Sequence, residues 1–300
     1  MGKAIEPGFY PDVSYDEYAS WDAVNHTKLS GFLNTPAHAR WLFLNDKPPT
    51  PAKEFGWLSH IAILEPHRLD AELAVRPDVD GRTKEGKPIL EAFKEKMKPG
   101  GEYAGRKMVT EEDRDRLRNI VTNVYQHETA REYLTGPGHN EVSIAWIDQE
   151  TSLPCKARLD RVAVVSKMPG VTFAPSSSQF MIVIDVKNIG EPASLRNVER
   201  AIFNYNYASQ AAMYLEGLQA IYPADEMRPF VWIVPEMDPP HLVRLFTPNP
   251  DLLEWGRQRW HNWLRQYAEC KRSGNWPGWD SGIEEASLPP WAAKVWEFSQ

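Results

Sequence analysis

Residues 181–184, Met-Ile-Val-Ile, form the most apolar of the predicted strands and are followed directly by Asp185, Val186 and Lys187. A short apolar run of this kind predicts a strand that is buried within a sheet. Side chains alternate along a strand, so Asp185 and Lys187 point to one face and Val186 points to the other. The chain therefore places an acid and a base together at the end of a buried strand, where an unpaired charge is costly.

The spacing of apolar residues changes from helical to strand-like near residue 141. Helical patterns cover residues 12–45, 54–65 and 111–134, and the polar residues 78–110 indicate a mobile surface segment. Strand patterns follow at 141–148, 155–165, 180–188, 229–236 and 241–247, with helical patterns over 194–220 and 250–272. This order predicts an α/β fold in one domain over residues 1–300: a mainly helical part (1–135), a core with a mixed sheet flanked by helices (136–272) and a loop-like tail (273–300).

Composition excludes several functional classes. The net charge of −7 argues against a protein that coats nucleic acid without specificity, although it leaves room for a local basic channel. Two cysteines, Cys155 and Cys270, are too few for an iron–sulfur cluster or a four-cysteine zinc site. No apolar stretch approaches the ~20 residues of a membrane helix, and no signal-peptide pattern is present. We therefore expect a cytoplasmic protein without membrane contact.

A second acid lies 25 residues before Asp185. Asp160 ends the run Lys-Ala-Arg-Leu-Asp, and if the two strands are neighbours both carboxylates meet at one edge. Carboxylate oxygens are the ligands that Mg²⁺ and Mn²⁺ prefer, and a nearby lysine can orient or deprotonate an attacking water. The alternative is structural: Asp160 pairs with Arg158 or Arg161, and Asp185 pairs with Lys187. The spacing alone leaves both interpretations open.

Three more residues carry a chemical and a structural interpretation. Gln210 and Tyr214 lie four residues apart on one helix face, and the residues alone favour a solvated or capping amide and a core aromatic residue over a chemical role. His60 lies among apolar residues in Gly-Trp-Leu-Ser-His-Ile-Ala-Ile-Leu-Glu-Pro and is either a metal ligand or a buried core histidine.

Five segments in this order resemble the exonuclease VIII (RecE) family, which belongs to the RecB-like branch of the PD-(D/E)xK nucleases. The segments are FGWLSHIAILEP, KARLDRV, IDVKNIG, YNYASQAAMY and GNWPG. A further likeness at LSGFLNTPAHA extends the resemblance over roughly residues 25–278. Each motif alone is unspecific, but the ordered set is specific.

The resemblance implies a role for each matching residue. His60, Asp160, Asp185 and the backbone carbonyl of Val186 would bind Mg²⁺, with Mn²⁺ as its substitute, and Lys187 would be the catalytic lysine. Gln210 and Tyr214 would hold the end of the substrate, and Tyr205 and Tyr207 would contact the DNA backbone or bases. All of these residues fall at the family's motif positions or on the same segment.

The sequence departs from the family pattern at four places. Leu159 replaces a proline, and Asn188 and Ile189 replace two threonines after the lysine, which puts the hydrogen bonds of those threonines in doubt. An insertion at 166–179 suggests a loop near DNA or at a subunit contact. Glu141 is either an extra acid at the site or, as we expect, a surface residue of its strand.

The function that the resemblance implies is a metal-dependent exodeoxyribonuclease. It would digest linear double-stranded DNA from 5′ ends and leave 3′ single strands for a single-strand annealing recombinase, as a ring-shaped homo-oligomer that threads the duplex. Lysine and arginine residues of segment 78–110 would contact DNA. The alternatives are a structure-specific endonuclease of the same fold, and a catalytically silent DNA-binding or assembly module.

Overall fold

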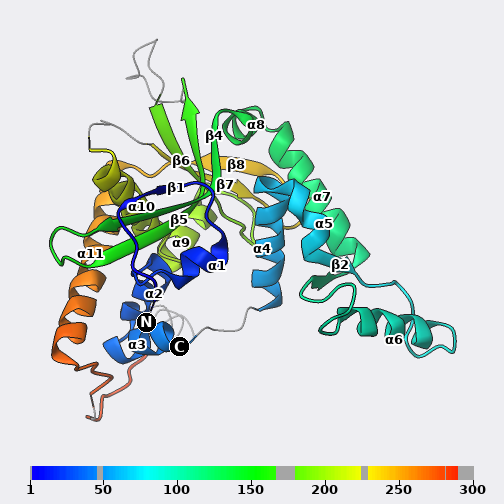
Figure 1. Ribbon diagram of the computed structural model, residues 1–300, viewed down its shortest axis with the longest axis horizontal. Coiled ribbons are helices and arrows are strands. Elements are labelled where there is room, and N and C mark those ends of the chain that lie inside the picture. Colours follow the sequence, from blue (N-terminus) through cyan, green and yellow to red (C-terminus); the bar gives the residue numbers. More distant parts are fainter. Residues whose placement is uncertain (1, 46–49, 167–179, 224–228, 281, 290–300) are drawn as a thin grey trace, which may run out of the picture.

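The sheet at the centre of the molecule has six strands in the order β1-β4-β5-β6-β7-β8 (Figure 1). The structure, a computed structural model, describes residues 2–45, 50–166, 180–223, 229–280 and 282–289. β6 and β7 pair in parallel and the other neighbouring strands pair antiparallel, which makes the sheet mixed. The bounds are β1 Gly8–Tyr10, β4 Gly138–Ile147, β5 Pro154–Val165, β6 Phe180–Val186, β7 Phe230–Pro235 and β8 Val243–Phe246.

Helices cover both faces of this sheet, which confirms the predicted α/β fold (Figure 1). Their bounds are α1 Tyr15–Ser20, α2 His26–Leu29, α3 Pro36–Leu44, α4 Pro51–Leu64, α5 Leu69–Glu72, α6 Gly86–Met97, α7 Glu111–Gln126, α8 Glu128–Thr135, α9 Leu195–Asn204, α10 Tyr207–Ile221 and α11 Pro250–Ser273. Two 3₁₀ turns, Ser30–Leu33 and Pro66–Arg68, join the shorter helices. A separate pair of parallel strands, β2 Leu73–Val75 and β3 Lys107–Val109, lies outside the main sheet.

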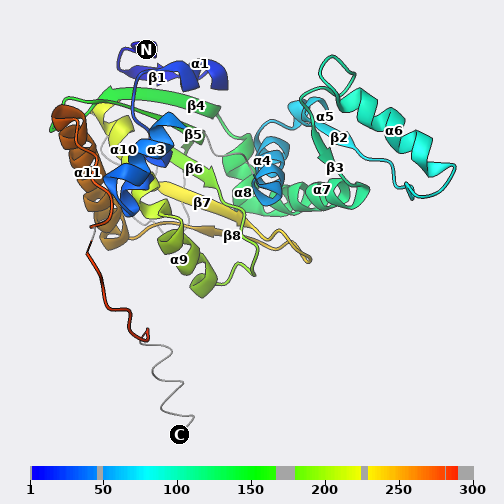
Figure 2. The same cartoon turned by 90° about the horizontal axis from the view of Figure 1, so that it is seen from below.

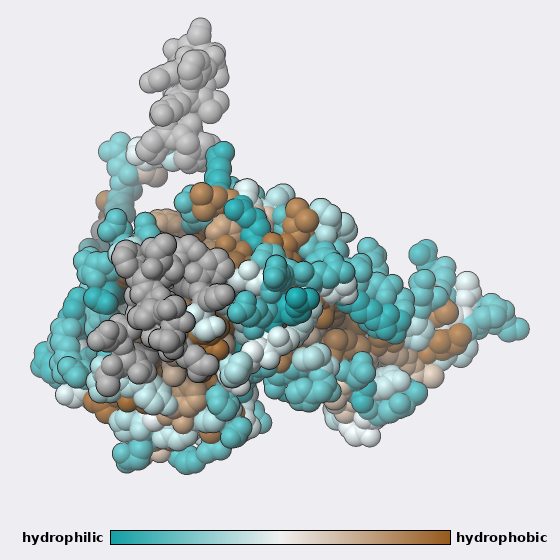
Figure 3. All heavy atoms as spheres, turned by 90° about the horizontal axis from the view of Figure 1, so that it is seen from above, coloured by the Kyte–Doolittle hydropathy of each residue, from teal (hydrophilic) through white to brown (hydrophobic). Residues whose placement is uncertain are grey.

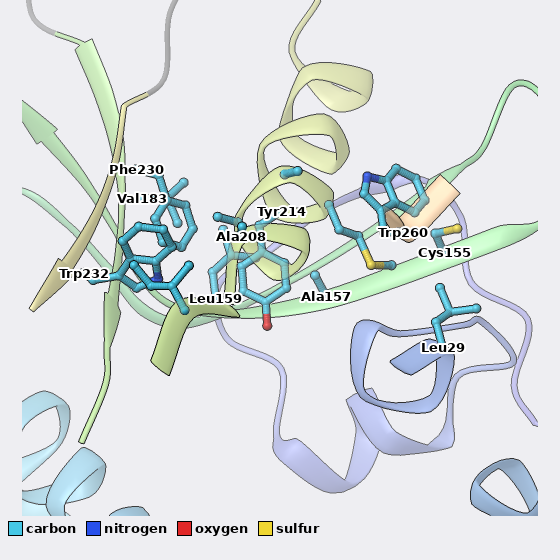
Figure 4. Packing of buried hydrophobic residues seen from close by; sticks show 14 of the residues in the cluster. Leu29, Cys155, Ala157, Leu159, Val183, Ala208, Tyr214, Phe230, Trp232 and Trp260 are labelled. Carbon is cyan, nitrogen blue, oxygen red and sulfur yellow. The ribbon is translucent and has the colours of Figure 1, made fainter. Parts of the chain in front are cut away.

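Alternation along β6 divides the core into two layers. Val183 belongs to the cluster that contains the buried faces of α10 and α11, whereas Ile182 and Ile184 belong to the cluster that contains α4, α7 and α8. Asp185 and Lys187 have the same parity as Val183, so they point to the α10 side. Figure 4 shows the α10-side cluster, in which the ring of Tyr214 from α10 lies among side chains of the sheet and the helices.

The backbone breaks two segments that the apolar pattern predicts as continuous helices. Segment 111–134 forms α7 and α8, which meet at His127, and the side chain of His127 accepts a hydrogen bond from the Ala130 N–H at the start of α8. Segment 194–220 forms α9 and α10, which meet at Asn206 with a φ of +58°. Apolar residues keep a helical spacing across both corners, so the spacing alone does not reveal them.

Residues 78–110, predicted as a mobile segment, contain a regular helix and a strand. α6 and the β2–β3 pair form an arm that projects away from the sheet beyond α7 (Figure 2). The ring of Phe93 on α6 lies 5.9 Å from that of Tyr103, and Tyr103 also lies 5.1 Å from Lys96 and from Arg106. These contacts explain how a polar stretch is ordered with few apolar side chains. Figure 3 shows that hydrophilic side chains dominate the arm's outer surface.

The remaining expectations concern the ends of the chain and the insertion. Residues 274–280 and 282–289, part of the predicted loop-like tail, have no regular secondary structure. The beginning of this tail contacts α3, where the Ala37 N–H donates to the Pro277 carbonyl over 3.0 Å, whereas residues 282–289 are exposed. The predicted loop at 166–179 lies outside the described residues, except for Ser166. Within the described part of the chain, no helix is long and apolar enough to cross a membrane.

The contact between α10 and α11 predicts a pH-dependent stability. His261 Nε2 lies 2.8 Å from Glu216 Oε2, and this hydrogen bond raises the pKa of His261 above its ordinary value of 6.5. Because the folded pKa is the higher one, the stabilisation is full below about pH 6.5 and is lost as the pH rises through the folded pKa. We expect His261→Gln to reduce the free energy of unfolding in urea by less than ~1 kcal/mol at low pH, since both side chains are partly exposed. If His261→Gln lost the same free energy of unfolding above the folded pKa as below it, the contact between His261 and Glu216 would not be the source of the pH dependence.

Candidate functional site

Asp185 and Lys187 come together at the carboxyl end of β6. Lys187 Nζ lies 2.7 Å from Asp185 Oδ2, and the backbone N–H of Lys187 donates to Ile233 on β7 over 2.9 Å. Asp185 is 1% exposed, and neither carboxylate oxygen accepts a hydrogen bond of regular geometry from the described residues. The ammonium of Lys187 is therefore the ionic partner of a buried carboxylate. The two oxygens of this carboxylate could still accept further hydrogen bonds or bind a cation.

Asp160 approaches the same point from the middle of β5, which corrects the expectation that it ends its strand. The register that pairs Arg161 with Ile184 places Asp160 opposite Asp185. Alternation along β5 shifts at Asp160: Leu159 lies in the α10-side cluster, but Ala163 and Val165 lie in the α4-side cluster. A break in a strand re-aims a side chain, so Asp160 needs no strand end to reach the site.

The ion pairs of Asp160 with its neighbouring arginines, which are the structural alternative to a metal site, are absent from the described residues. Asp160 Oδ2 accepts from the backbone N–H of Val186 over 2.7 Å. Arg158 instead donates to Glu141 and Ser143, and Arg161 donates to Asn140 and to two backbone carbonyls. Of the two structural pairings that the sequence left open, the Asp185–Lys187 pair is the one that forms.

His60 lies against this cluster from α4. Its Nδ1 is 3.3 Å from Asp160 Oδ2. Burial, and then the charge of Lys187, lower the pKa of His60 below its ordinary value, which keeps the ring neutral. A neutral imidazole with a side chain 26% exposed can present a nitrogen lone pair to a cation.

Asn188 fastens the end of β6 to α4, a role that the sequence did not indicate. Its Nδ2 donates to the Gly56 carbonyl over 3.1 Å, and its Oδ1 accepts from Ser59 Oγ over 3.3 Å. Ser59 directly precedes His60 and is fully buried. Asn188 thus makes hydrogen bonds that hold the helix of His60 next to Lys187.

Replacement of Asn188 by alanine is expected to lower the free energy of unfolding by ~1–3 kcal/mol, because the buried Ser59 hydroxyl and the Gly56 carbonyl both lose a partner. Asn197→Ala is the matched control, since Asn197 also donates to a backbone carbonyl, that of Pro192, but does not touch α4. Urea unfolding of both variants measures the difference. Equal losses in the two variants would remove Asn188 from its bridging role.

Glu141 is part of the site rather than an ordinary surface residue of its strand. It lies opposite Asp160 between the paired positions of β4 and β5, with a φ of +53° that is rare for a residue other than glycine. Its side chain is 26% exposed and pairs with Arg158 over 2.9 Å. Burial raises the pKa of Glu141, and the negative charge of Asp160 raises it further. The carboxylates of Glu141 and Asp160 are therefore close enough to repel each other.

Burial dominates the electrostatics of the three acids. It raises the pKa of Asp160 and raises that of Asp185 to about 6, although Lys187 opposes both shifts. For Lys187, burial works against the charge, but Asp185 and Asp160 outweigh it and raise the pKa. At neutral pH the cluster therefore combines crowded carboxylates with a firmly protonated lysine.

The donor chemistry of this cluster fits Mg²⁺ or Mn²⁺. Both oxygens of Asp185 lack a hydrogen-bond donor of regular geometry, and Asp160 adds a second carboxylate next to them. Such a buried, under-satisfied carboxylate is the group that a hard cation would satisfy. Among the described residues, however, no three His, Cys, Asp or Glu side chains are already gathered around one point, and Lys187 contacts Asp185 instead. The residue types of the cluster nevertheless suit a hard cation.

Gln210 and Tyr214 bind one another, with the Gln210 amide donating to the Tyr214 hydroxyl over 2.8 Å. Tyr214 is 7% exposed and belongs to the α10-side core. Burial raises its pKa well above the ordinary value, and the charge of Asp185 contributes, so the hydroxyl is within electrostatic reach of the cluster. Tyr207 lies directly against Lys187, with its ring centroid 4.6 Å from Lys187 Nζ. The ring of Tyr205 lies 5.6 Å from that of Tyr207.

Two hollows open on either side of the cluster. The first, of about 1250 Å³, is lined by β4, β5, α4 and the N-terminal residues 11–16, and it contains Glu141 and Asp160. The second, of about 880 Å³, lies between α4 and the α9–α10 corner and contains Lys187, Asn188 and Tyr207. Lys53, Trp57 and His60 of α4 border both hollows. The cluster is thus accessible from two directions.

Comparison with known proteins supports the fold. No protein-family model matches the chain, and no curated protein matches its sequence. Among solved structures, one similar fold is a crystal structure from Eubacterium rectale described as a candidate exonuclease. It has a TM-score of 0.58 and 13% identity, over 95% of this chain and 98% of the other. The likeness extends over nearly both whole chains and shows a shared fold.

Proposed function

We propose that this protein is a metal-dependent exodeoxyribonuclease. The observation that carries the proposal is the buried Asp185 carboxylate, whose oxygens have no regular hydrogen-bond donor among the described residues although Asp160, His60 and Lys187 surround it. A structural salt bridge would normally be satisfied on all sides. The fold shared with a candidate exonuclease and the ordered motifs of the exonuclease VIII family support the same activity.

The residues of the cluster divide into those that would hold the metal and those that would act on the substrate. Asp160, Asp185, the Val186 carbonyl and His60 would hold Mg²⁺. When bound, the ion would supply a water of lowered pKa and neutralise charge on the phosphate. Lys187 has a raised pKa, so it would orient a water or a phosphate oxygen by donating hydrogen bonds rather than by removing a proton. Tyr207 lies against Lys187 and would limit where its ammonium can point.

The finer parts of the proposal concern the substrate. We infer digestion of linear double-stranded DNA from 5′ ends, which leaves 3′ single strands for an annealing recombinase, by a ring-shaped homo-oligomer. Gln210 and Tyr214 would position the end nucleotide through hydrogen bonds. These statements rest on the family resemblance described above.

One digestion experiment tests the activity and its direction. Linear duplex labelled at either the 5′ or the 3′ end is incubated with the protein in Mg²⁺, with a closed circular duplex and an EDTA reaction as controls. The expected result is Mg²⁺-dependent early release of the 5′ label and no attack on the circle. Cutting of the circle would favour an endonuclease of the same fold, and no digestion at all would favour a silent DNA-binding module.

A further inference from the structure

The two hollows differ in charge. The first hollow is lined by seven acidic side chains and four lysines or arginines. The second is lined by three cationic side chains, Lys53, Lys187 and Arg200, and one acid, Glu191. Arg200 pairs with Glu191 at the exposed rim, and an exposed ion pair is easily exchanged for a phosphate. A polyanion that reaches the cluster is therefore attracted by the second hollow and repelled by the first.

The second hollow also offers exposed aromatic rings from both of its sides. Trp57, on α4, is 41% exposed, and Tyr205, at the α9–α10 corner, is 65% exposed. Both rings leave a large part of their surface open to solvent. The left-handed backbone of Asn206 separates Tyr205 from Tyr207, so that Tyr207 turns to Lys187 while Tyr205 remains open to solvent.

Resting on the function proposed above, we infer that the second hollow binds a single strand of DNA, with unpaired bases stacked on Trp57 and Tyr205. Bases within a duplex already stack on one another and hide their faces, so exposed rings beside cationic side chains suit a separated strand. Lys53 and Arg200 contact its phosphates, and Lys187 stands at the inner end. The strand that is cut therefore reaches the cluster along this side, after it has left its complement.

The test measures binding without cleavage. A short fluorescein-labelled oligothymidylate is titrated with the full-length protein in EDTA, and anisotropy gives the affinity. Trp57→Ala and Tyr205→Ala are each expected to weaken binding by roughly 5- to 150-fold, the range for loss of one stacked base. Trp57→Phe and Tyr205→Phe should restore most of it, because a ring remains.

Tyr15→Ala is the matched control, since Tyr15 is 67% exposed but lines the acidic first hollow. It should bind the oligonucleotide like the wild type. A blunt duplex of equal length should show little difference among the variants. An oligonucleotide with 2-aminopurine adds a readout for stacking: its fluorescence should be quenched by the wild type and the Phe variants but not by the Ala variants.

The outcomes separate this inference from the proposed function. Undiminished oligonucleotide binding by both Ala variants, or equal weakening by Tyr15→Ala, would overturn the stacking site even if the protein digests DNA in Mg²⁺. Loss of binding in the Ala variants with rescue by Phe would support the site even if no digestion were seen. Equal weakening for duplex and single strand would also overturn it, because a duplex has no free base faces to lose.

Discussion

Replacement of Asp185 by asparagine is expected to reduce Mg²⁺-dependent cleavage by at least about a thousandfold, because the loss of a metal-binding carboxylate removes several kcal/mol of transition-state stabilisation. The variant should fold normally. Burial raises the pKa of this acid to about 6, so its ionisation at neutral pH lowers the stability of the folded protein, and asparagine has no such cost. Single-turnover cleavage of a short duplex and unfolding in urea measure the two effects.

Asp12→Asn is the control for this variant. Asp12 lines the first hollow and is exposed, but it has no contact with the cluster that would make it a ligand. Its replacement should leave cleavage unchanged. If Asp185→Asn kept nearly normal activity, or if both variants lost it equally, the cluster would not be the catalytic site.

Replacement of Lys187 by alanine is expected to slow cleavage by ~100- to 1,000-fold while DNA affinity changes little, because a donor aimed at developing charge acts mainly in the transition state. The affinity is measured in EDTA and the rate under single-turnover conditions in Mg²⁺. The variant also leaves Asp185 without its ion pair, so circular dichroism must first show that it is folded.

For Lys53→Ala, in the same hollow, we expect the opposite result: a loss of DNA affinity without a loss of cleavage rate. Lys53 is exposed and, among the described residues, makes no hydrogen bond or ion pair with the cluster, so its loss should weaken DNA binding and leave the rate at saturating DNA intact. Should Lys187→Ala instead weaken binding and turnover by equal factors, Lys187 would be a phosphate-binding residue like Lys53.

The sequence predicts β6 and its charged end well, because a buried strand follows simple alternation. Four apolar residues, then Asp185 and Lys187 with one parity, define both the burial and the direction of the two charges. His60 shows a limit of the same reasoning. Its apolar surroundings on α4 favour a core histidine over a ligand, and only the structure shows that its ring lies against Asp160.

The position of Asp160 could not be predicted from alternation, because alternation fails there. The parity of β5 shifts at Asp160, and Glu141 opposite has a positive φ. Neither aspartate nor glutamate is a residue type that indicates a positive φ or a shift in the alternation of a strand. A glycine at position 141 would have signalled it, whereas a glutamate with φ of +53° is strained and is seen only in the structure.

The arm and the Asn188 bridge were missed for different physical reasons. Segment 78–110 has few apolar residues, and order there depends on the packing of Tyr103 with Phe93, Lys96 and Arg106, which a search for apolar periodicity does not detect. The bridge joins positions 129 and 132 residues apart through side-chain and backbone polar groups. Such long-range polar contacts have no local signal in a single sequence.

The place of β6 between β5 and the much later β7 has a consequence for synthesis of the protein in the cell. Lys187 is held by the Ile233 carbonyl of β7, so the cluster cannot be complete until residue 235 has left the ribosome. Contacts over such long stretches of chain form late in folding. On the function proposed above, a nascent chain that lacks β7 would be unable to cut DNA, and in an organism that couples translation to transcription the genome beside the ribosome would be protected until the domain is nearly finished.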